Sequence, residues 1–137
     1  MPPRTILVVD DDPVFASSIQ MAARAISDLN VHVAIDCPSA LLLLGERPYP
    51  VVVLDLDLGS HGSGLEVLGW LRKHAPQTIL IVVSAHFTDY LMELLSLFHA
   101  VKATFTKPVN VNVVARVLAS YVAEGELQSA LGPVEVV

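Results

Sequence analysis

The sequence predicts an α/β domain built around a parallel β-sheet. Five short runs rich in β-branched residues alternate with longer segments that carry apolar residues at helical spacing, which is typical of repeated βα units. The five runs span residues 5–9, 31–35, 51–54, 79–83 and 103–106. The chain of 137 residues is long enough for one such domain and too short for two.

The five runs differ in how their apolar residues are distributed. The runs at 5–9, 51–54 and 79–83 are apolar without alternation, as expected of central strands that are covered by helices on both faces. The run at 31–35 alternates more between apolar and polar residues. We therefore expect this second run to form an edge strand.

Asp12 marks the start of the first predicted helix. Its carboxylate can accept hydrogen bonds from the free N–H groups of the first turn, and Pro13 suits the first helical position. The helix is expected to reach about Asp28. Its apolar face consists of Phe15, Ile19, Ala22, Ala23 and Ile26. We assign Asp12 to helix capping and not to ligand binding.

Two helices are expected after the second and third strands. A weaker pattern predicts a helix over about residues 39–46. Ser63 and Glu66 have the spacing of a capping box, which predicts that a helix opens there and reaches about His74. Ala75-Pro76 then closes this helix.

The last two predicted helices also begin at polar residues. Thr88 can cap a helix that reaches about His99. Asn110 can cap the final helix, which is expected to end at Gly125. Residues 125–137 carry too little pattern for a second domain, so we interpret them as a C-terminal tail or a linker.

Composition restricts the partners and the compartment. Eight Lys and Arg against 14 Asp and Glu give a net charge of −6, and the basic residues are scattered, so no direct nucleic-acid partner is expected. Cys37 is the single cysteine, which excludes an intrachain disulfide and a cysteine zinc cluster. The apolar runs are far shorter than the ~18 residues of a membrane span, and no secretory signal pattern is present. We expect a cytoplasmic protein with no membrane partner.

Polar side chains suited to phosphoryl chemistry follow four of the predicted strands. They are Asp10-Asp11-Asp12 after the first strand, Asp55-Leu56-Asp57 after the third, Ser84-Ala85 after the fourth and Lys107-Pro108 after the fifth. Ligands bind at the carboxyl ends of parallel strands, so these residues are expected to share one site. Clustered carboxylates repel one another unless a hard cation such as Mg²⁺ binds them, and a hydroxyl and a lysine beside that ion suit a transferred phosphoryl group.

Four fragments carry these polar residues. Residues 6–13 read Ile-Leu-Val-Val-Asp-Asp-Asp-Pro, and residues 51–58 read Val-Val-Val-Leu-Asp-Leu-Asp-Leu. Val83-Ser84-Ala85 and Thr106-Lys107-Pro108 follow. In this order, the fragments resemble the motifs of the receiver domains of two-component response regulators. The resemblance covers about residues 4–124 and implies a flavodoxin-like parallel sheet of strand order 2-1-3-4-5 with helices on both faces.

The resemblance also implies a role for each site residue. Asp55 would accept a phosphoryl group from a sensor histidine kinase or a phosphotransfer protein. Mg²⁺ would be held by Asp10, Asp11, Asp55 and the backbone carbonyl of Asp57, while Ser84 and Lys107 would bind phosphoryl oxygens. The domain would switch a partner or an output surface while it is phosphorylated, and it would not act as a turnover enzyme.

Three further expectations come from the same resemblance. The family uses a cis peptide bond at the position of Lys107-Pro108. The loop at residues 59–64 carries about one residue more than is usual. Thr104 stands where the family often has an aromatic switch residue, with Phe105 next to it. The last two features are departures from the family pattern.

The segment 89–98 predicts an interaction surface. It carries charge only at Asp89 and Glu93, and its apolar residues surround nearly the whole circumference of the helix. Because one stripe packs on the sheet, we expect other apolar side chains to stay exposed near the fifth helix. The fourth helix, fifth strand and fifth helix are therefore expected to contact a second copy or an output partner.

Two other functions fit part of the pattern. The segment 54–57 also resembles the nucleophile motif of haloacid-dehalogenase-type phosphatases, although in that family the motif follows the first strand. A receiver-like module that binds partners without phosphorylation is the second alternative, since the loop at 59–64 and Thr104 depart from the family pattern. Turnover of a small phosphate ester would identify the phosphatase, and labelling of Asp55 would exclude the unphosphorylated module.

Overall fold

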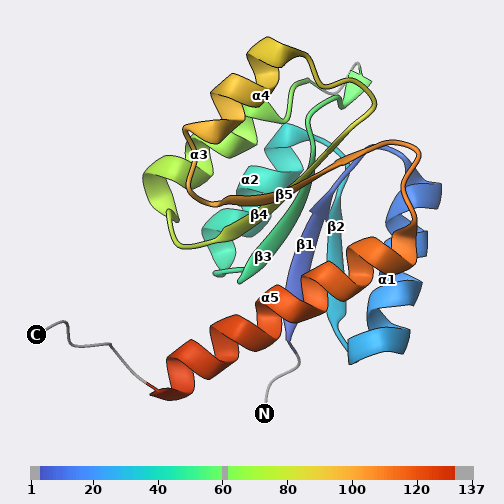
Figure 1. Cartoon of the computed structure of the whole chain (residues 1–137), viewed down its shortest axis with the longest axis vertical. Coiled ribbons are helices and arrows are strands. Elements are labelled where there is room, and N and C mark those ends of the chain that lie inside the picture. The colour runs from blue at the N-terminus through green and yellow to red at the C-terminus, as the bar shows by residue number, and fades with distance from the viewer. Residues whose placement is uncertain (1–3, 60–61, 132–137) are drawn as a thin grey trace, which may run out of the picture.

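The computed structural model describes residues 4–59 and 62–131 as a five-stranded parallel sheet with helices on both faces (Figure 1). The strand order is β2-β1-β3-β4-β5, so the predicted fold is confirmed. In chain order the elements are β1 (Thr5–Val9), α1 (Pro13–Ser27), β2 (Asn30–Ala34), α2 (Cys37–Glu46), β3 (Val51–Asp55), α3 (Leu65–His74), β4 (Ile79–Ser84), α4 (Asp89–Ser96), β5 (Val101–Thr106) and α5 (Val111–Leu131).

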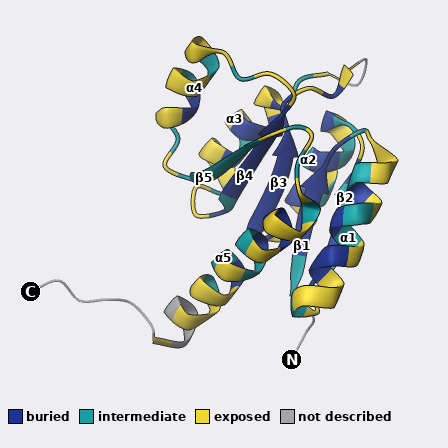
Figure 2. Ribbon diagram, turned by 45° about the vertical axis from the view of Figure 1, so that its right-hand side comes forward, coloured by how far each residue is buried: buried dark blue, intermediate teal, exposed yellow. Residues whose placement is uncertain are grey.

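The sheet separates two apolar cores. On one face α1 and α5 pack on a cluster that includes Ile6, Ile19 and Leu118, and on the other face α2, α3 and α4 pack on a cluster that includes Leu54 and Leu68. Figure 2 shows β1, β3 and β4 almost entirely buried between these layers. The burial of both faces accounts for the uninterrupted apolar runs of these strands.

The edges of the sheet agree with the distribution of apolar residues. β2 forms one edge, which confirms the expectation for the second run. β5 forms the other edge and begins at Val101, two residues before the predicted start of the run. No helix within the described residues is both long and apolar enough to cross a membrane.

The start of α1 follows the sequence prediction. The Asp12 carboxylate accepts hydrogen bonds from the N–H groups of Val14 at 3.0 Å and Phe15 at 3.4 Å, and Pro13 occupies the first turn. The helix ends at Asp28, whose φ of 54° turns the chain into the left-handed region. Asp12 therefore acts as a helix cap at the point where β1 ends.

The prediction that Gly125 ends the last helix is wrong. α5 continues through Gly125 to Leu131 and extends beyond the sheet (Figure 1). A glycine inside a helix costs only about 1 kcal/mol, and here the following turn is held by an ion pair of 3.1 Å between Glu126 and Arg4, next to the start of β1. A boundary at residue 125 thus falls inside a helix, and the part of the predicted tail at 132–137 lies outside the described residues.

The capping box predicted at Ser63 does not form. α3 begins at Leu65, and the Ser63 hydroxyl accepts its bond from the Leu65 N–H, at 3.2 Å, rather than from the N–H of Glu66. The cause is the close approach of Gly64 to β3. The N–H of Gly64 donates to the carbonyl of Leu56 at 3.0 Å, so the chain is tied to the end of β3 before the helix begins.

A side chain at Gly64 would collide with this strand end. A Cβ atom there would lie 2.9 Å from the Cα of Leu56 and closer still to the carbonyl oxygen of Asp55. Both contacts are with backbone, which cannot move away without displacing β3. Gly64 therefore permits the loop before α3 to pack against the residue that ends β3.

We expect Gly64→Ala to destabilise the fold by about 2 kcal/mol, because the added methyl group overpacks a backbone contact. Urea unfolding followed by circular dichroism measures this loss. The matched control is Gly69→Ala within α3, where a Cβ atom meets nothing within 4 Å. That variant is expected to gain about 0.5–1 kcal/mol from helix propensity. Equal stability of the two variants would contradict the close packing of Gly64 against the end of β3.

Candidate functional site

The carboxyl ends of four strands meet at one end of the sheet. Asp10 follows β1, Asp55 ends β3, Ser84 ends β4 and Lys107 follows β5. The parallel register brings these ends level, since Asp55 lies opposite Val83 on β4 and Ser84 lies opposite Thr106 on β5. Residues that are widely separated in sequence thus share a site because all the strands run in the same direction.

Three carboxylates form the centre of this site. One oxygen from each of Asp10, Asp11 and Asp55 lies within 4.8 Å of the others. Asp10 is fully buried, Asp55 is 4% exposed and Asp11 is partly exposed. Two of the three acids are therefore almost completely withdrawn from water.

Lys107 compensates the charge of the two buried acids. Its Nζ lies 2.9 Å from Asp10 Oδ2 and 3.0 Å from Asp55 Oδ2. Its backbone N–H donates to the carbonyl of Ser84 at 2.8 Å, and the predicted cis bond to Pro108 is confirmed. The lysine is therefore fixed at its backbone and at its ammonium group.

Each buried acid uses its second oxygen to bind backbone. Asp10 Oδ1 accepts from the N–H of Asp12 at 2.8 Å, and Asp55 Oδ1 accepts from the N–H of Asp57 at 2.9 Å. In both cases the donor lies two residues after the acid. Both carboxylates are consequently oriented before any ligand enters.

The ionisation of Asp55 and Lys107 reflects these contacts. Burial raises the pKa of Asp55, while the Asp57 N–H and Lys107 oppose the rise and the neighbouring Asp10 adds to it. Burial lowers the pKa of Lys107, but its hydrogen bonds to Asp10 and Asp55 outweigh this effect, so its pKa lies above the usual value. The contacts thus favour the protonated form of Lys107, whereas burial makes the ionised form of Asp55 costly.

Ser84 lies at the site, but its hydroxyl group is turned toward its own loop. Its Oγ donates to the carbonyl of His86 at 3.1 Å and accepts from the N–H of His86 at 3.2 Å. The side chain is 4% exposed. These two hydrogen bonds of the hydroxyl group therefore stay within the segment 84–86.

Asp57 is exposed, and its carboxylate is not part of the three-acid cluster. Asp57 Oδ1 accepts from the N–H of Gly59 at 2.9 Å, and the residue pairs with Ser63 in a short antiparallel bridge. That bridge uses the carbonyl of Leu56 and the N–H of Leu58. It therefore fixes the backbone at Asp57 while leaving its side chain at the surface.

A hollow of about 260 Å³ opens beside the site. It lies between the loop after β3 and the loop after β4, and is lined by Leu56, Asp57, Ser63, Leu65, Ser84, His86 and Leu91. Apolar and polar side chains share its wall. This hollow thus gives access to the carboxyl end of the sheet next to Ser84.

Two structural residues of the site were missed by the sequence analysis. Phe15 was placed on the apolar face of its helix, but its ring centroid lies 4.7 Å from the ammonium nitrogen of Lys107. The sequence predicts Gly64 in the loop 59–64 and within a capping box, but not its packing against Asp55. The glycine-rich run before α3 is the one sequence signal for the contact of Gly64 with Asp55. The contact of Phe15 with Lys107 has no such signal.

The comparisons with known proteins agree on the family. The family model described as response regulator receiver domain matches residues 6–119. Over 83 residues the chain is 40% identical to the probable transcriptional regulatory protein TcrX of Mycobacterium tuberculosis, an alignment that covers 61% of this chain and 35% of that protein. Over 84 residues it is 34% identical to the putative response regulator NtrX-like of Rickettsia conorii, covering 61% of this chain and 18% of that protein. The chain therefore spans a minor part of these relatives.

Solved structures support the same fold. The signal receiver domain of a putative Luxo repressor protein from Vibrio parahaemolyticus superposes with a TM-score of 0.83 at 19% identity, over 96% of this chain and 99% of that one. A response regulator protein from Burkholderia pseudomallei, solved with a phosphorylated aspartic acid, a calcium ion and citrate, gives a TM-score of 0.74 at 25% identity, over 97% of this chain and 77% of that one. The chain belongs to the receiver domain family of two-component response regulators.

Proposed function

We propose that the chain is a phosphoacceptor that takes a phosphoryl group onto Asp55 from a phosphohistidine of a sensor histidine kinase or a phosphotransfer protein. The observation that carries this proposal is that three carboxylates and Lys107 meet at the carboxyl ends of the strands. The phosphorylated aspartic acid of the Burkholderia pseudomallei neighbour supports it. The activity belongs in the cytoplasm, in keeping with the single cysteine.

The donor set at these strand ends fits a hard divalent cation. Asp10, Asp11 and Asp55 offer carboxylate oxygens within 4.8 Å of one another, and oxygen is the ligand that Mg²⁺ prefers. These residues, with the backbone carbonyl of Asp57, would hold the ion. When bound, the ion neutralises charge on the acids and on the phosphoryl oxygens.

Asp55 acts as the nucleophile in this proposal. A carboxylate oxygen of Asp55 attacks phosphorus in line, an O–P bond forms, and the N–P bond to the donor imidazole breaks with its electrons moving to nitrogen. The Asp57 N–H and Lys107 both favour the ionised carboxylate that this attack requires. The product is an aspartyl phosphate, which water hydrolyses to reset the domain.

Lys107 and Ser84 bind the transferred group. Lys107 already lies 3.0 Å from Asp55 and can pair with a phosphoryl oxygen without large movement. Ser84 breaks its two bonds to His86 and turns toward the phosphoryl group. Because Ser84 ends β4, its movement pulls on the loop that leads into α4.

The exposed face of α4 is the proposed output surface. Tyr90 and Met92 of α4 are 76% and 42% exposed, and Leu97, directly after the helix, is 68% exposed, whereas Leu95 is buried. Apolar side chains of the segment 89–98 thus remain exposed as expected, although α4 and α5 pack on opposite faces of the sheet. We propose that α4, β5 and α5 form a contact with a second copy or an output partner.

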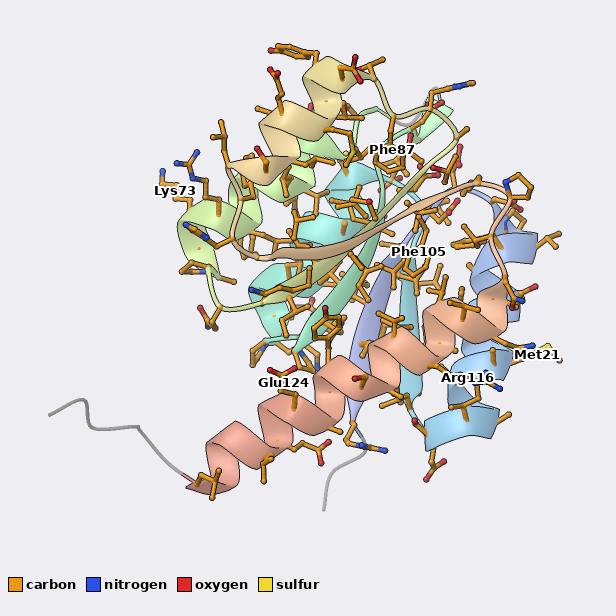
Figure 3. All side chains as sticks on the ribbon, in the orientation of Figure 1. Met21, Lys73, Phe87, Phe105, Arg116 and Glu124 are labelled. Atoms are coloured by element: carbon orange, nitrogen blue, oxygen red, sulfur yellow. The ribbon has the colours of Figure 1, made fainter. Side chains whose placement is uncertain are left out.

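Thr104 and Phe105 lie on opposite faces of β5. Thr104 lines a hollow of about 370 Å³ together with residues of α4, such as Met92. Phe105 packs with the core on the α5 side, as Figure 3 shows. No aromatic side chain lines this hollow from β5, so movement of α4 rather than an aromatic rotamer carries the signal in this proposal.

The domain organisation that we propose places the receiver unit at about residues 4–124. The curated relatives are much longer than the aligned segments, so α5 beyond this unit is positioned to lead toward an output segment. A phosphatase of the haloacid-dehalogenase type is not favoured, because Asp55 ends the third strand and the acid pair follows the first.

Acetyl phosphate with Mg²⁺ is expected to phosphorylate Asp55, and removal of the metal with EDTA should abolish the reaction. Borohydride trapping followed by peptide mass spectrometry locates the label. Asp55→Asn is expected to lose at least 95% of the label, roughly the background of a variant that lacks its nucleophile.

The matched control is Asp12→Asn, which removes a nearby carboxylate but keeps a residue that can cap α1. It should retain labelling within about twofold of the original protein. Full labelling of Asp55→Asn would overturn the assignment of the nucleophile. A complete absence of label in the original protein would instead favour the unphosphorylated interaction module.

Beryllium fluoride with Mg²⁺, as a phosphoryl mimic, is expected to increase self-association through α4, β5 and α5. Sedimentation velocity with and without the mimic measures the change. Replacing the exposed Tyr90 and Leu97 by Ser should weaken association by about tenfold or more, since each loses apolar burial. The exposed Met21 on α1 offers a control, Met21→Ser. If the mimic leaves the association of the original protein and of every variant unchanged, a second copy is excluded as the partner.

A further inference from the structure

Phe15 contacts the one group that bridges the two buried acids. The ammonium nitrogen of Lys107 lies 4.7 Å from the centroid of the Phe15 ring, within the range of a cation–π interaction. The same nitrogen bonds to Asp10 and Asp55. The ammonium group thus contacts two carboxylates and an aromatic face.

The chain places this ring by local structure. Phe15 belongs to the first turn of α1, and its N–H donates to the Asp12 carboxylate at 3.4 Å. Asp12 in turn donates its own N–H to Asp10 at 2.8 Å. One continuous segment therefore positions an acid that binds Lys107, the helix cap and the ring over Lys107.

The proposed function creates a need for this contact. Cation binding at Asp10, Asp11 and Asp55 neutralises the carboxylates that hold Lys107, so their attraction for the ammonium group weakens. A flexible lysine side chain then gains access to solvent unless another contact restrains it. An aromatic face attracts the ammonium group of Lys107, but it does not compete with the acids for the metal ion.

We propose that Phe15 is a positioning residue that holds the Lys107 ammonium group over Asp55 through its ring face. This inference rests on the proposed phosphoacceptor function and adds a residue to it. The ring limits the excursions of Lys107 and shields it from water, both before and during phosphoryl transfer. Phe15 acts through Lys107 in this role and takes no direct part in phosphoryl transfer.

The first test measures the chemical accessibility of Lys107 without metal. The protein, in EDTA, is treated with a limiting amount of an amine-acetylating reagent, and peptide mass spectrometry gives the rate at each lysine. The other two lysines, Lys73 and Lys102, are exposed and serve as internal references. Phe15→Leu is expected to raise the relative rate at Lys107 by about three- to tenfold, because the aromatic contact is lost while the apolar volume is kept.

Phe15→Tyr separates the ring face from simple packing. Tyrosine keeps the aromatic face, so this variant is expected to hold the Lys107 rate within about twofold of the original protein. Met21→Leu, on an exposed part of α1, should change nothing. An unchanged rate in Phe15→Leu would overturn the proposal, and so would a rate in Phe15→Tyr as high as that in Phe15→Leu.

The second test uses phosphorylation by acetyl phosphate. Phe15→Leu is expected to lower the maximal rate about three- to tenfold and to leave the Mg²⁺ concentration for half-maximal rate unchanged, since the ring does not contact the acids. A raised Mg²⁺ requirement would show a general distortion of the site and contradict the proposal. If the original protein takes no phosphoryl group, the proposed function fails, while the metal-free lysine rates still decide whether Phe15 positions Lys107.

Discussion

The ion-pair bridge from Lys107 to Asp10 and Asp55 is the interaction on which the rest of the site depends. It links the segment after β5 to the ends of β1 and β3, two of the three interior strands of the sheet. Two carboxylates with almost no exposure would be very costly to keep ionised without a nearby cation. The bridge allows the fold to bury acids where its chemistry requires them.

The bridge also explains why the surrounding backbone is so fully engaged. Asp10 and Asp55 each bind a backbone N–H with the oxygen that faces away from Lys107. Gly64 brings the loop before α3 against the carbonyl of Asp55. These contacts fix the direction of the carboxylates, so a cation or a phosphoryl group meets an arrangement that is already oriented.

Much of the fold and the cluster of acids could be predicted from the sequence. The uninterrupted apolar run at 51–54 indicates a central strand, and in a parallel sheet the residue that follows such a strand must lie at the ligand-binding edge. The sequence therefore predicts that Asp55 lies near Asp10 and Lys107. The agreement arises because strand direction alone decides which ends meet.

The remaining features depend on contacts that sequence spacing does not encode. The hydroxyl of Ser84 is bound to His86, a matter of side-chain rotation. Phe15 has the spacing of a core residue, and only the position of Lys107 gives its ring another contact. Gly125 is a plausible helix end by type, yet the ion pair at Glu126 secures the next turn.

The most direct test of the bridge is the stability of Lys107→Met with and without Mg²⁺, measured by chemical unfolding. Without metal, this variant should lose about 3–5 kcal/mol, because two buried carboxylates are left without their cation. Mg²⁺ should then stabilise the variant more than it stabilises the original protein, since no ammonium group competes for the acids. Lys102→Met, at an exposed position, should be neutral in both conditions. A Lys107→Met protein as stable as the original in EDTA would contradict the account.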